Sequence, residues 1–298
     1  MEACEQTRYE ALYAQHLRAL KLQGKADATA DSYARAVRRA AAYFDRCPDQ
    51  LSSEDFKNYF ASLIDTRSWS LVKIDRCGLQ FFYEHVLARE WTWVDIIKAP
   101  VVKSLPDVLS LDEIARIVSG TRERRYQTFW WTTYSLGLRL SEALNLRIGD
   151  IDAGRGQVHI RNGKGHKDRF VVLPTLTLAC LRRYWREHRH PKLLFPGNGS
   201  SATGVMDRGS TQKAFARVIA DCKINKQVSI HSLRHAYATH LIEVGLNLRG
   251  VQELLGHSCP QTTACYVHMT DKCRADRRVL IDDLIAQLRE ALLQQRAR

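Results

Sequence analysis

Residues 230–241 read I-H-S-L-R-H-A-Y-A-T-H-L, and the rest of the chain is best interpreted from this segment outward. Its pattern predicts a helix over residues 233–244, with Ser232 as the N-cap. His231 and Arg234 would then lie together at the N-terminus of that helix. A helix N-terminus with a guanidinium beside it is a good binding site for phosphate. The alternative is that both side chains are simply satisfied within a protein core.

A second motif and a single tyrosine follow this segment. Asn247 and Gly256 have the residue types of an N-cap and of a left-handed helix stop, so a short helix should lie between them. His257 comes directly after that helix, and Tyr266 comes nine residues later. Isolated tyrosines are usually structural, but a tyrosine near two histidines and arginines is a candidate nucleophile.

Two patterns in this region resemble metal sites without matching them. His231 and His235 are four residues apart, but Ser232 stands where the zinc-protease pattern needs a glutamate. The histidines and cysteines between residues 257 and 273 fit no standard zinc spacing. We therefore expect neither a metal nor another cofactor.

The net charge of +13 is unevenly distributed over the 298 residues. Residues 1–98 contain 14 basic and 14 acidic residues, whereas the remaining 200 contain 31 and 18. This excess suggests a polyanionic partner, most simply nucleic acid, although an ordinary basic surface would look the same. The chain has no apolar run of about 18 residues, no signal-peptide pattern and no C-x-x-C pair among its eight cysteines. We therefore expect a cytoplasmic protein.

The first third of the chain predicts a small helical domain over residues 1–98. Apolar periodicity indicates four helices, near residues 8–23, 28–44, 53–64 and 70–89, and Ser53 has the residue type of an N-cap for the third. On the second of these, three basic residues lie off the apolar stripe and could follow a DNA backbone: Arg35, Arg38 and Arg39. An ordinary solvent-exposed face is an equally good reading. Pro100 and Pro106 indicate a linker over residues 99–109.

The remaining residues, 110–298, predict a mostly α domain with a small β-sheet. Val158 and Ile160 alternate with polar residues, which indicates a strand, and Asn162-Gly163 is a strong hairpin-turn signal before a return strand over 170–173. Three basic residues crowd this turn and its exit: Lys164, Lys167 and Arg169. Helices are predicted near residues 110–118, 125–136, 139–146, 175–190, 211–222 and 279–293, with a loop over 196–210.

Five short motifs together resemble the tyrosine recombinases of the phage integrase family, which include the Xer recombinases. They are G-L-R-L-S-E-A-L-N-L at 137–146, N-G-K-G-H-K-D-R at 162–169, H-S-L-R-H-A-Y-A-T-H-L at 231–241, L-G-H-S at 255–258 and Y-V-H at 266–268. Each motif alone is weak, but all five stand in the family's order and near its spacing. The resemblance covers about residues 8–270, and the N-terminal part shares only helical character and size.

The resemblance implies a role for each matching residue. Tyr266 would attack a DNA phosphodiester and hold it as a 3′-phosphotyrosine, while Arg139 and Arg234 would bind the non-bridging oxygens. The resemblance further implies that Lys164 protonates the leaving 5′ oxygen and that His231 assists proton transfer at the tyrosine.

The same resemblance assigns the remaining groups and the architecture. His257 would donate a further hydrogen bond to the phosphate, and Glu142 would support its neighbours without taking part in the chemistry. A helical core-binding domain and an α+β catalytic domain would close around double-stranded DNA as a C-shaped clamp. Four subunits, alone or with a partner recombinase, would assemble on two duplexes. The helix over 279–293, whose apolar stripe is Leu280, Leu284, Leu288 and Leu292, could dock on a neighbouring subunit or on its own.

The leading interpretation is therefore a site-specific DNA recombinase or integrase of a mobile element, plasmid or bacterial chromosome. Its phosphotyrosine bond would conserve the energy of the cleaved strand, so ATP would not be needed, and no P-loop motif occurs. Two alternatives remain open at this point. A type IB topoisomerase shares the chemistry, and a catalytically silent DNA-binding protein could share the fold.

Overall fold

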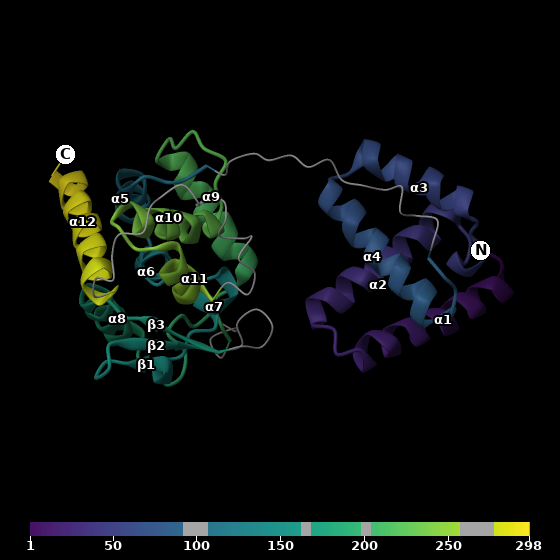
Figure 1. Ribbon diagram of the computed structural model, residues 1–298, viewed down its shortest axis with the longest axis horizontal. Coiled ribbons are helices and arrows are strands. Elements are labelled where there is room, and N and C mark those ends of the chain that lie inside the picture. Colours follow the sequence, from purple (N-terminus) through teal and green to yellow (C-terminus); the bar gives the residue numbers. More distant parts are fainter. Residues whose placement is uncertain (92–106, 162–167, 198–203, 257–276, 298) are drawn as a thin grey trace. The chain divides into compact units, whose positions relative to one another are not determined.

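The computed structural model describes residues 1–91, 107–161, 168–197, 204–256 and 277–297 (Figure 1). The chain divides into two compact units, Met1–Ser104 and Leu105–Arg298. Each unit is considered by itself below.

The N-terminal unit is helical, as predicted. Its helices are α1 (Ala3–Leu22), α2 (Asp27–Phe44), α3 (Ser53–Thr66) and α4 (Trp69–His85), with a 3-10 turn η1 at Pro48–Gln50. Gly24 ends α1 with a positive φ of 61°. The N-cap of α3 is Ser52 and not Ser53, because the Ser52 hydroxyl and the Asp55 carboxylate bond each other's backbone N–H groups in a capping box.

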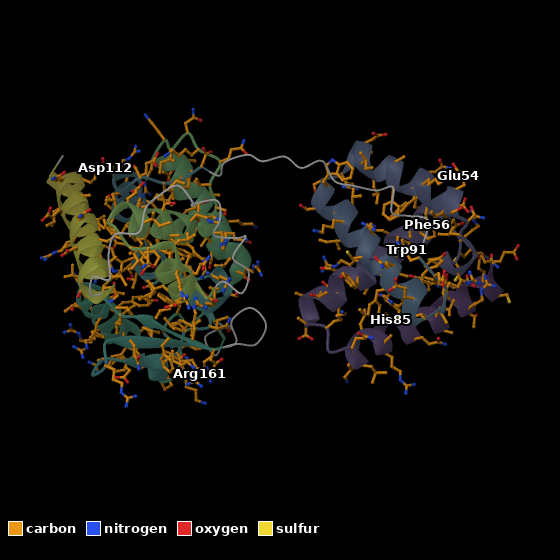
Figure 2. All side chains as sticks on the ribbon, in the orientation of Figure 1. Glu54, Phe56, His85, Trp91, Asp112 and Arg161 are labelled. Carbon is orange, nitrogen blue, oxygen red and sulfur yellow. The ribbon has the colours of Figure 1, made fainter. Side chains whose placement is uncertain are left out.

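Aromatic side chains form the core of this unit. Phe56 and Trp91 meet edge to face with their ring centroids 5.5 Å apart, so Trp91, which stands in the segment after α4, packs against α3 (Figure 2). Helices α2 and α4 pack closely because Gly78 has no side chain: a Cβ there would lie 2.8 Å from that of Ala36. Residues 92–98, the end of the predicted helical domain, lie outside the described residues.

The C-terminal unit is mostly helical around one central helix. Its helices are α5 (Leu111–Gly120), α6 (Arg124–Ser135), α7 (Leu140–Leu144), α8 (Thr175–His188), α9 (Arg208–Asp221), α10 (Ile230–Glu243), α11 (Leu248–Leu255) and α12 (Arg277–Ala297), with a 3-10 turn η2 at Ile148–Asp150. Helix α6 is buried on almost every side, since even its threonines are covered. It packs between α5, α8 and α10, and α12 lies along α5 and α8 (Figure 1).

A small antiparallel sheet lies at one end of this unit, with strand order β1-β2-β3. The strands are β1 (Ile151–Asp152), β2 (Gln157–Ile160) and β3 (Arg169–Val172). Val158 faces Val171, and Ile160 faces Arg169, so the predicted hairpin is confirmed. The turn itself lies outside the described residues, and the two-residue strand β1 was not predicted because it is too short to show alternation.

The predicted fold class is confirmed: the chain is mostly α-helical with one small β-sheet, and it divides into two units. Helix α9 begins at Arg208, three residues earlier than predicted, because Asp207 caps it by accepting from the Ser210 N–H at 2.6 Å. None of the helices in the described ranges is long and apolar enough to span a membrane.

Candidate active site

Arg139 is positioned by a tight turn between α6 and α7. Gly137 reverses the chain with a φ of 59°, a conformation that side chains rarely adopt. Arg139 then caps α7: its backbone N–H donates to Glu142 Oε2 at 2.9 Å, and its Nη1 donates to Glu142 Oε1 at 2.7 Å. The guanidinium is therefore held at the start of α7 while part of it faces solvent.

Arg234 connects three segments that are distant in sequence. Its Nη1 donates to the Gly137 carbonyl at 2.7 Å, and its Nη2 donates to the Leu255 carbonyl at 2.6 Å. The side chain is only 2% exposed. The two carbonyls stand two residues before Arg139 and two residues before His257, so Arg234 fixes both approaches to the predicted site.

The helix that carries Arg234 starts earlier than the sequence indicated. Helix α10 begins at Ile230 with Ser229 as its N-cap, and Ser232 occupies the third helical position, where it completes a capping box with Ser229. The prediction that Ser232 caps the helix was wrong. Ile230 is buried in the core as the first residue of the helix, so the helix begins three residues earlier than predicted. His231 consequently lies in the first turn and not before it.

Glu142 is the common acceptor of this cluster. Both of its oxygens accept from Arg139 and Arg169, and Arg234 Nη1 lies 3.6 Å from Oε2. Burial alone would raise the pKa of this carboxyl, but the hydrogen bonds and charges of Arg169 and Arg139 outweigh it and lower the pKa to about 2. Glu142 is therefore an anion under all ordinary conditions.

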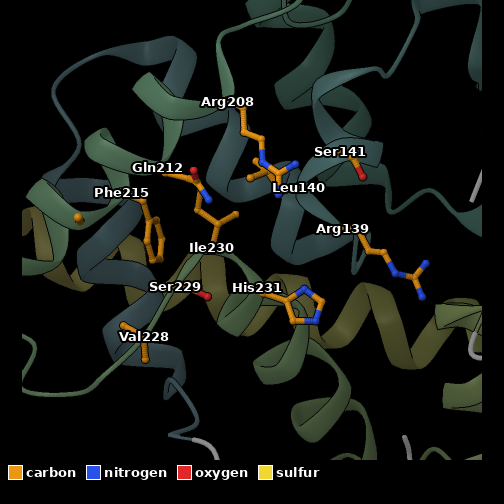
Figure 3. Close-up of a pocket in the computed structure, with 11 residues that line it drawn as sticks. Arg139, Leu140, Ser141, Arg208, Gln212, Phe215, Val228, Ser229, Ile230 and His231 are labelled. Atoms are coloured by element: carbon orange, nitrogen blue, oxygen red, sulfur yellow. The ribbon is translucent and has the colours of Figure 1, made fainter. Parts of the chain in front are cut away.

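His231 and Arg139 line one cavity of about 430 Å³ from two different helices (Figure 3). Part of His231 is exposed, but desolvation by the surrounding protein is still the largest cause that lowers its pKa, to about 4, and the neighbouring His235, Arg234 and Arg139 lower it further. The imidazole is thus neutral near pH 7 and able to accept a proton. The His235 ring meets it edge to face, with centroids 4.6 Å apart.

Two further polar residues of this cavity were missed in the sequence. Arg208 and Gln212 line it from α9, opposite the start of α10 (Figure 3). No local motif marks them, because their place beside His231 depends on how α9 packs in the folded unit. The one available signal was a basic residue following the cap Asp207.

The structure brings together half of the six predicted catalytic residues. Arg139, His231 and Arg234 meet around Glu142 and the cavity, whereas Lys164, His257 and Tyr266 lie outside the described residues. What is described are the segments that lead to two of them: strand β2 ends four residues before Lys164, and α11 ends two residues before His257.

The predicted DNA-binding residues have different environments. Arg35 and Arg38 are exposed on α2, where Arg35 pairs with Asp31 one turn away and the Arg38 guanidinium lies 5.9 Å from the centre of the Tyr13 ring. Arg39, in contrast, pairs with the fully buried Asp75, while its own side chain is 34% exposed.

Arg169, a fourth predicted DNA-binding residue, is bonded to Glu142 within the protein. Its side chain is 11% exposed, and both terminal nitrogens donate to Glu142, so it does not face solvent as a DNA contact would. Lys167 lies outside the described residues.

No cluster of three or more His, Cys, Asp or Glu side chains suited to a metal occurs within the described ranges. The histidines and cysteines between 257 and 273 lie outside them.

Sequence comparison identifies relatives of both units. Residues 107–272 match the Phage integrase family, and residues 12–93 match the N-terminal SAM-like domain of phage integrases. The chain is 36% identical over 241 residues to a putative integrase/recombinase, y4qK, of Sinorhizobium fredii, covering 80% of this chain and 78% of that protein. It is 35% identical over 179 residues to the tyrosine recombinase XerD of Listeria innocua, covering 56% and 60% of the two chains.

Solved structures share the fold at lower identity. The integrase of transposon Tn1549 in complex with transposon right end DNA superimposes with a TM-score of 0.67 at 16% identity, covering 87% of this chain and 95% of that one. The XerH site-specific recombinase bound to its difH substrate superimposes with a TM-score of 0.61 at 21% identity, covering 81% and 75%.

Proposed function

The chain belongs to the phage integrase family and is a tyrosine-type site-specific recombinase, and from this premise we propose that it cuts and rejoins DNA through a 3′-phosphotyrosine intermediate. The observation that carries the proposal is the convergence of Arg139 and His231 on one cavity, with Arg234 behind them. A site with several guanidinium groups and one buried carboxylate retains positive charge, which suits a phosphodiester.

The two arginines supply the electrostatic part of the mechanism. A phosphate under attack gains negative charge on its non-bridging oxygens, and Arg139 and Arg234 would stabilise that charge. Arg139 is the more accessible of the two, and the bonds of Arg234 to two backbone carbonyls fix where it can meet the phosphate. Because these cations are built into the protein, the charge is neutralised without a metal. ATP is not needed because the phosphotyrosine bond conserves the energy of the cleaved strand.

Bond cleavage proceeds by in-line displacement at phosphorus. The Tyr266 phenol oxygen forms a bond to phosphorus as the bond to the 5′ oxygen breaks, and Lys164 donates a proton to that leaving oxygen. Neutral His231 accepts the phenol proton, and His257 donates a hydrogen bond to the phosphate. A 5′ hydroxyl of another strand then displaces Tyr266, so one phosphodiester is lost and one is formed.

The substrate is double-stranded DNA with a specific recombination site. Both structural neighbours described above are complexes with DNA, and the basic excess after residue 98 gives this chain the charge to follow a backbone. Arg35 and Arg38, both exposed, are the contacts we assign to the N-terminal unit. A tetramer on two duplexes, with or without a partner recombinase, would exchange the strands. We place the protein in the cytoplasm, encoded by a mobile element, plasmid or bacterial chromosome.

The first test is to capture the covalent complex. DNA fragments that remain attached to the denatured protein in cells are sequenced, which identifies the site, and a nicked duplex of that site is used to trap the adduct in vitro. The wild type should form the adduct, and Tyr266→Phe should form none while it retains DNA binding. Loss of binding together with the adduct would instead give Tyr266 a structural role, and relaxation of DNA without site dependence would favour a topoisomerase.

A second test concerns the general acid. Lys164→Ala should slow cleavage because the 5′ oxygen leaves unprotonated. A 5′-bridging phosphorothiolate has a better leaving group and should restore the rate of this variant. If the sulfur substrate does not rescue Lys164→Ala, another group protonates the leaving oxygen.

A further inference from the structure

We propose that Arg169 is a positioning residue: it saturates the buried Glu142 carboxylate so that the Arg139 guanidinium stays available for the DNA phosphate. The inference rests on the proposed function, because it needs Arg139 to bind the phosphate. It replaces the expectation that Arg169 contacts DNA.

The geometry of the pair is that of a buried structural bond. Arg169 Nη1 donates to Glu142 Oε1 at 2.8 Å, and Arg169 Nη2 donates to Oε2 at 2.7 Å. This bidentate interaction fixes the orientation of the guanidinium relative to the carboxylate. The side chains of Arg169 and Glu142 are 11% and 3% exposed. A phosphate contact by Arg169 would therefore require both bonds to break and the buried carboxylate to lose its principal partner.

The charge balance explains what this bond does for Arg139. Arg139 gives Glu142 only one side-chain hydrogen bond, from Nη1, alongside its backbone N–H. If an uncharged residue replaced Arg169, the buried carboxylate would need further hydrogen bonds from the guanidinium of Arg139, or from that of Arg234, whose Nη1 is already 3.6 Å away. Each donor taken in this way is withdrawn from the phosphate. Arg169 prevents this exchange by occupying both oxygens.

The place of Arg169 in the fold links it to more than one catalytic segment. It opens β3, so it is the residue at which the chain returns from the hairpin that carries Lys164. Its aliphatic part passes over Gly256, where a Cβ would lie 2.7 Å from Arg169 Cδ, and Gly256 directly precedes His257. One side chain thus ties the hairpin, the start of α7 and the end of α11.

The first experiment separates positioning from DNA contact. On the nicked duplex identified above, Arg169→Met should lower the rate of adduct formation by about 100-fold. Its affinity for the same duplex should keep the salt dependence of the wild type, whereas loss of one phosphate contact would reduce the slope of log K against log salt by about 0.9. A reduced slope would overturn the proposal and return Arg169 to the DNA interface.

The second experiment tests the mechanism by rescue. The double variant Glu142→Gln/Arg169→Met removes both buried charges together, so no carboxylate remains to capture Arg139. It should form adduct at least about 10-fold faster than Arg169→Met. A double variant as slow as or slower than the single one would show that Arg169 acts other than through Glu142. If Arg169→Met does not fold, Arg169→Lys takes its place, because lysine keeps the charge but cannot form the two parallel hydrogen bonds. The adduct rate of Arg169→Lys is then compared with that of Glu142→Gln/Arg169→Lys, and a faster double variant again supports the proposal.

Arg155→Met is the matched control. Arg155 lies on the same unit, its side chain is 80% exposed, and its guanidinium Nε approaches Asp152 Oδ2 only to 3.9 Å. Its adduct rate should equal that of the wild type.

The wild-type protein also separates the two proposals: absence of its adduct would contradict the proposed function, whereas a normal wild-type adduct with an unaffected Arg169→Met would contradict only the role of Arg169.

Discussion

At the scale of single residues, the catalytic unit separates fixed charges from groups held neutral. The arginines and Glu142 are permanently charged, whereas burial lowers the pKa values of His231, His235 and His240. Neutral imidazoles beside cationic guanidinium groups avoid further repulsion in the DNA-free protein. The arrangement should therefore become less stable when these histidines are forced to accept protons.

His240 gives the clearest test of this statement. It is buried in α10, where its Nδ1 lies 2.9 Å from the Tyr134 hydroxyl, and burial lowers its pKa to about 4. Between pH 6.5 and 4 the unfolded chain binds a proton that the folded chain excludes, so stability is full above this window and falls as the pH falls through it. At pH 5 the loss from this one group is about 2 kcal/mol.

The measurement is the free energy of unfolding at pH 7.5 and pH 5, followed by amide hydrogen exchange in α6 and α10. His240→Gln keeps a polar partner for Tyr134 but does not titrate, so its difference between the two pH values should be smaller than that of the wild type by about 2 kcal/mol. An unchanged difference would mean that His240 is not the group that titrates.

The sequence indicated which residues belong to the candidate site but not the bonds that hold them in place. Arg139, His231 and Arg234 were recognised because their motifs are local and carry the family's residue types. The bond between Arg169 and Glu142 joins residues 27 positions apart. No spacing rule connects a strand residue with a helix residue at that separation, so the partner of Arg169 could only be found in the folded chain.

At the scale of elements, the site is built from helix ends, and glycines place those ends. Gly137 and Gly256 both have positive φ values, 59° and 62°. The carbonyls of Gly137 and of Leu255, the residue before Gly256, accept the two bonds of Arg234. A change in either turn therefore moves a carbonyl that accepts a hydrogen bond from Arg234, as well as the helix end.

Gly137→Ala should be strongly destabilising. A Cβ there would lie 2.5 Å from Tyr237 Cδ1 and 2.9 Å from Leu255 Cδ2, and both neighbours are buried. Backbone strain and overpacking together should cost about 3 kcal/mol. Gly24→Ala is the control, because Gly24 has a similar φ of 61° but nothing within 4 Å of its Cβ position, so only about 1 kcal/mol of strain is expected.

Urea unfolding of the two variants measures the difference. Equal losses would show that the Tyr237 ring moves aside without cost and that the turn tolerates a side chain.

The element predictions failed where tertiary packing overrides a local signal. Ser53 and Ser232 looked like caps from their residue type, but the helices begin one and three residues earlier, at positions set by Ser52 and by the buried Ile230. Periodicity found the apolar stripe of α12 and placed two of its buried residues correctly, Leu284 and Leu288.

At the scale of the whole molecule, the position of the last helix decides how subunits would be joined. The sequence left open whether this helix docks on a neighbour or on its own subunit. In the free chain α12 lies along α5 and α8 of its own unit (Figure 1). Four of its side chains are fully buried there: Ile281, Leu284, Ile285 and Leu288. This helix therefore completes the core of the unit that carries it.

Leu288→Ala tests that packing. The change leaves a cavity in the core and should destabilise the catalytic unit by about 3 kcal/mol. Leu293→Ala on the same helix is the control, because Leu293 is 54% exposed and its loss should stay within about 0.5 kcal/mol. The wild type and both variants are unfolded with urea in the absence of DNA, at protein concentrations that differ by about 50-fold. A helix docked within its own chain gives the same midpoint at both concentrations, whereas a helix docked on a second copy raises the midpoint as the concentration rises. Such a rise in the wild type, lost in Leu288→Ala, would contradict the packing of α12 on its own subunit.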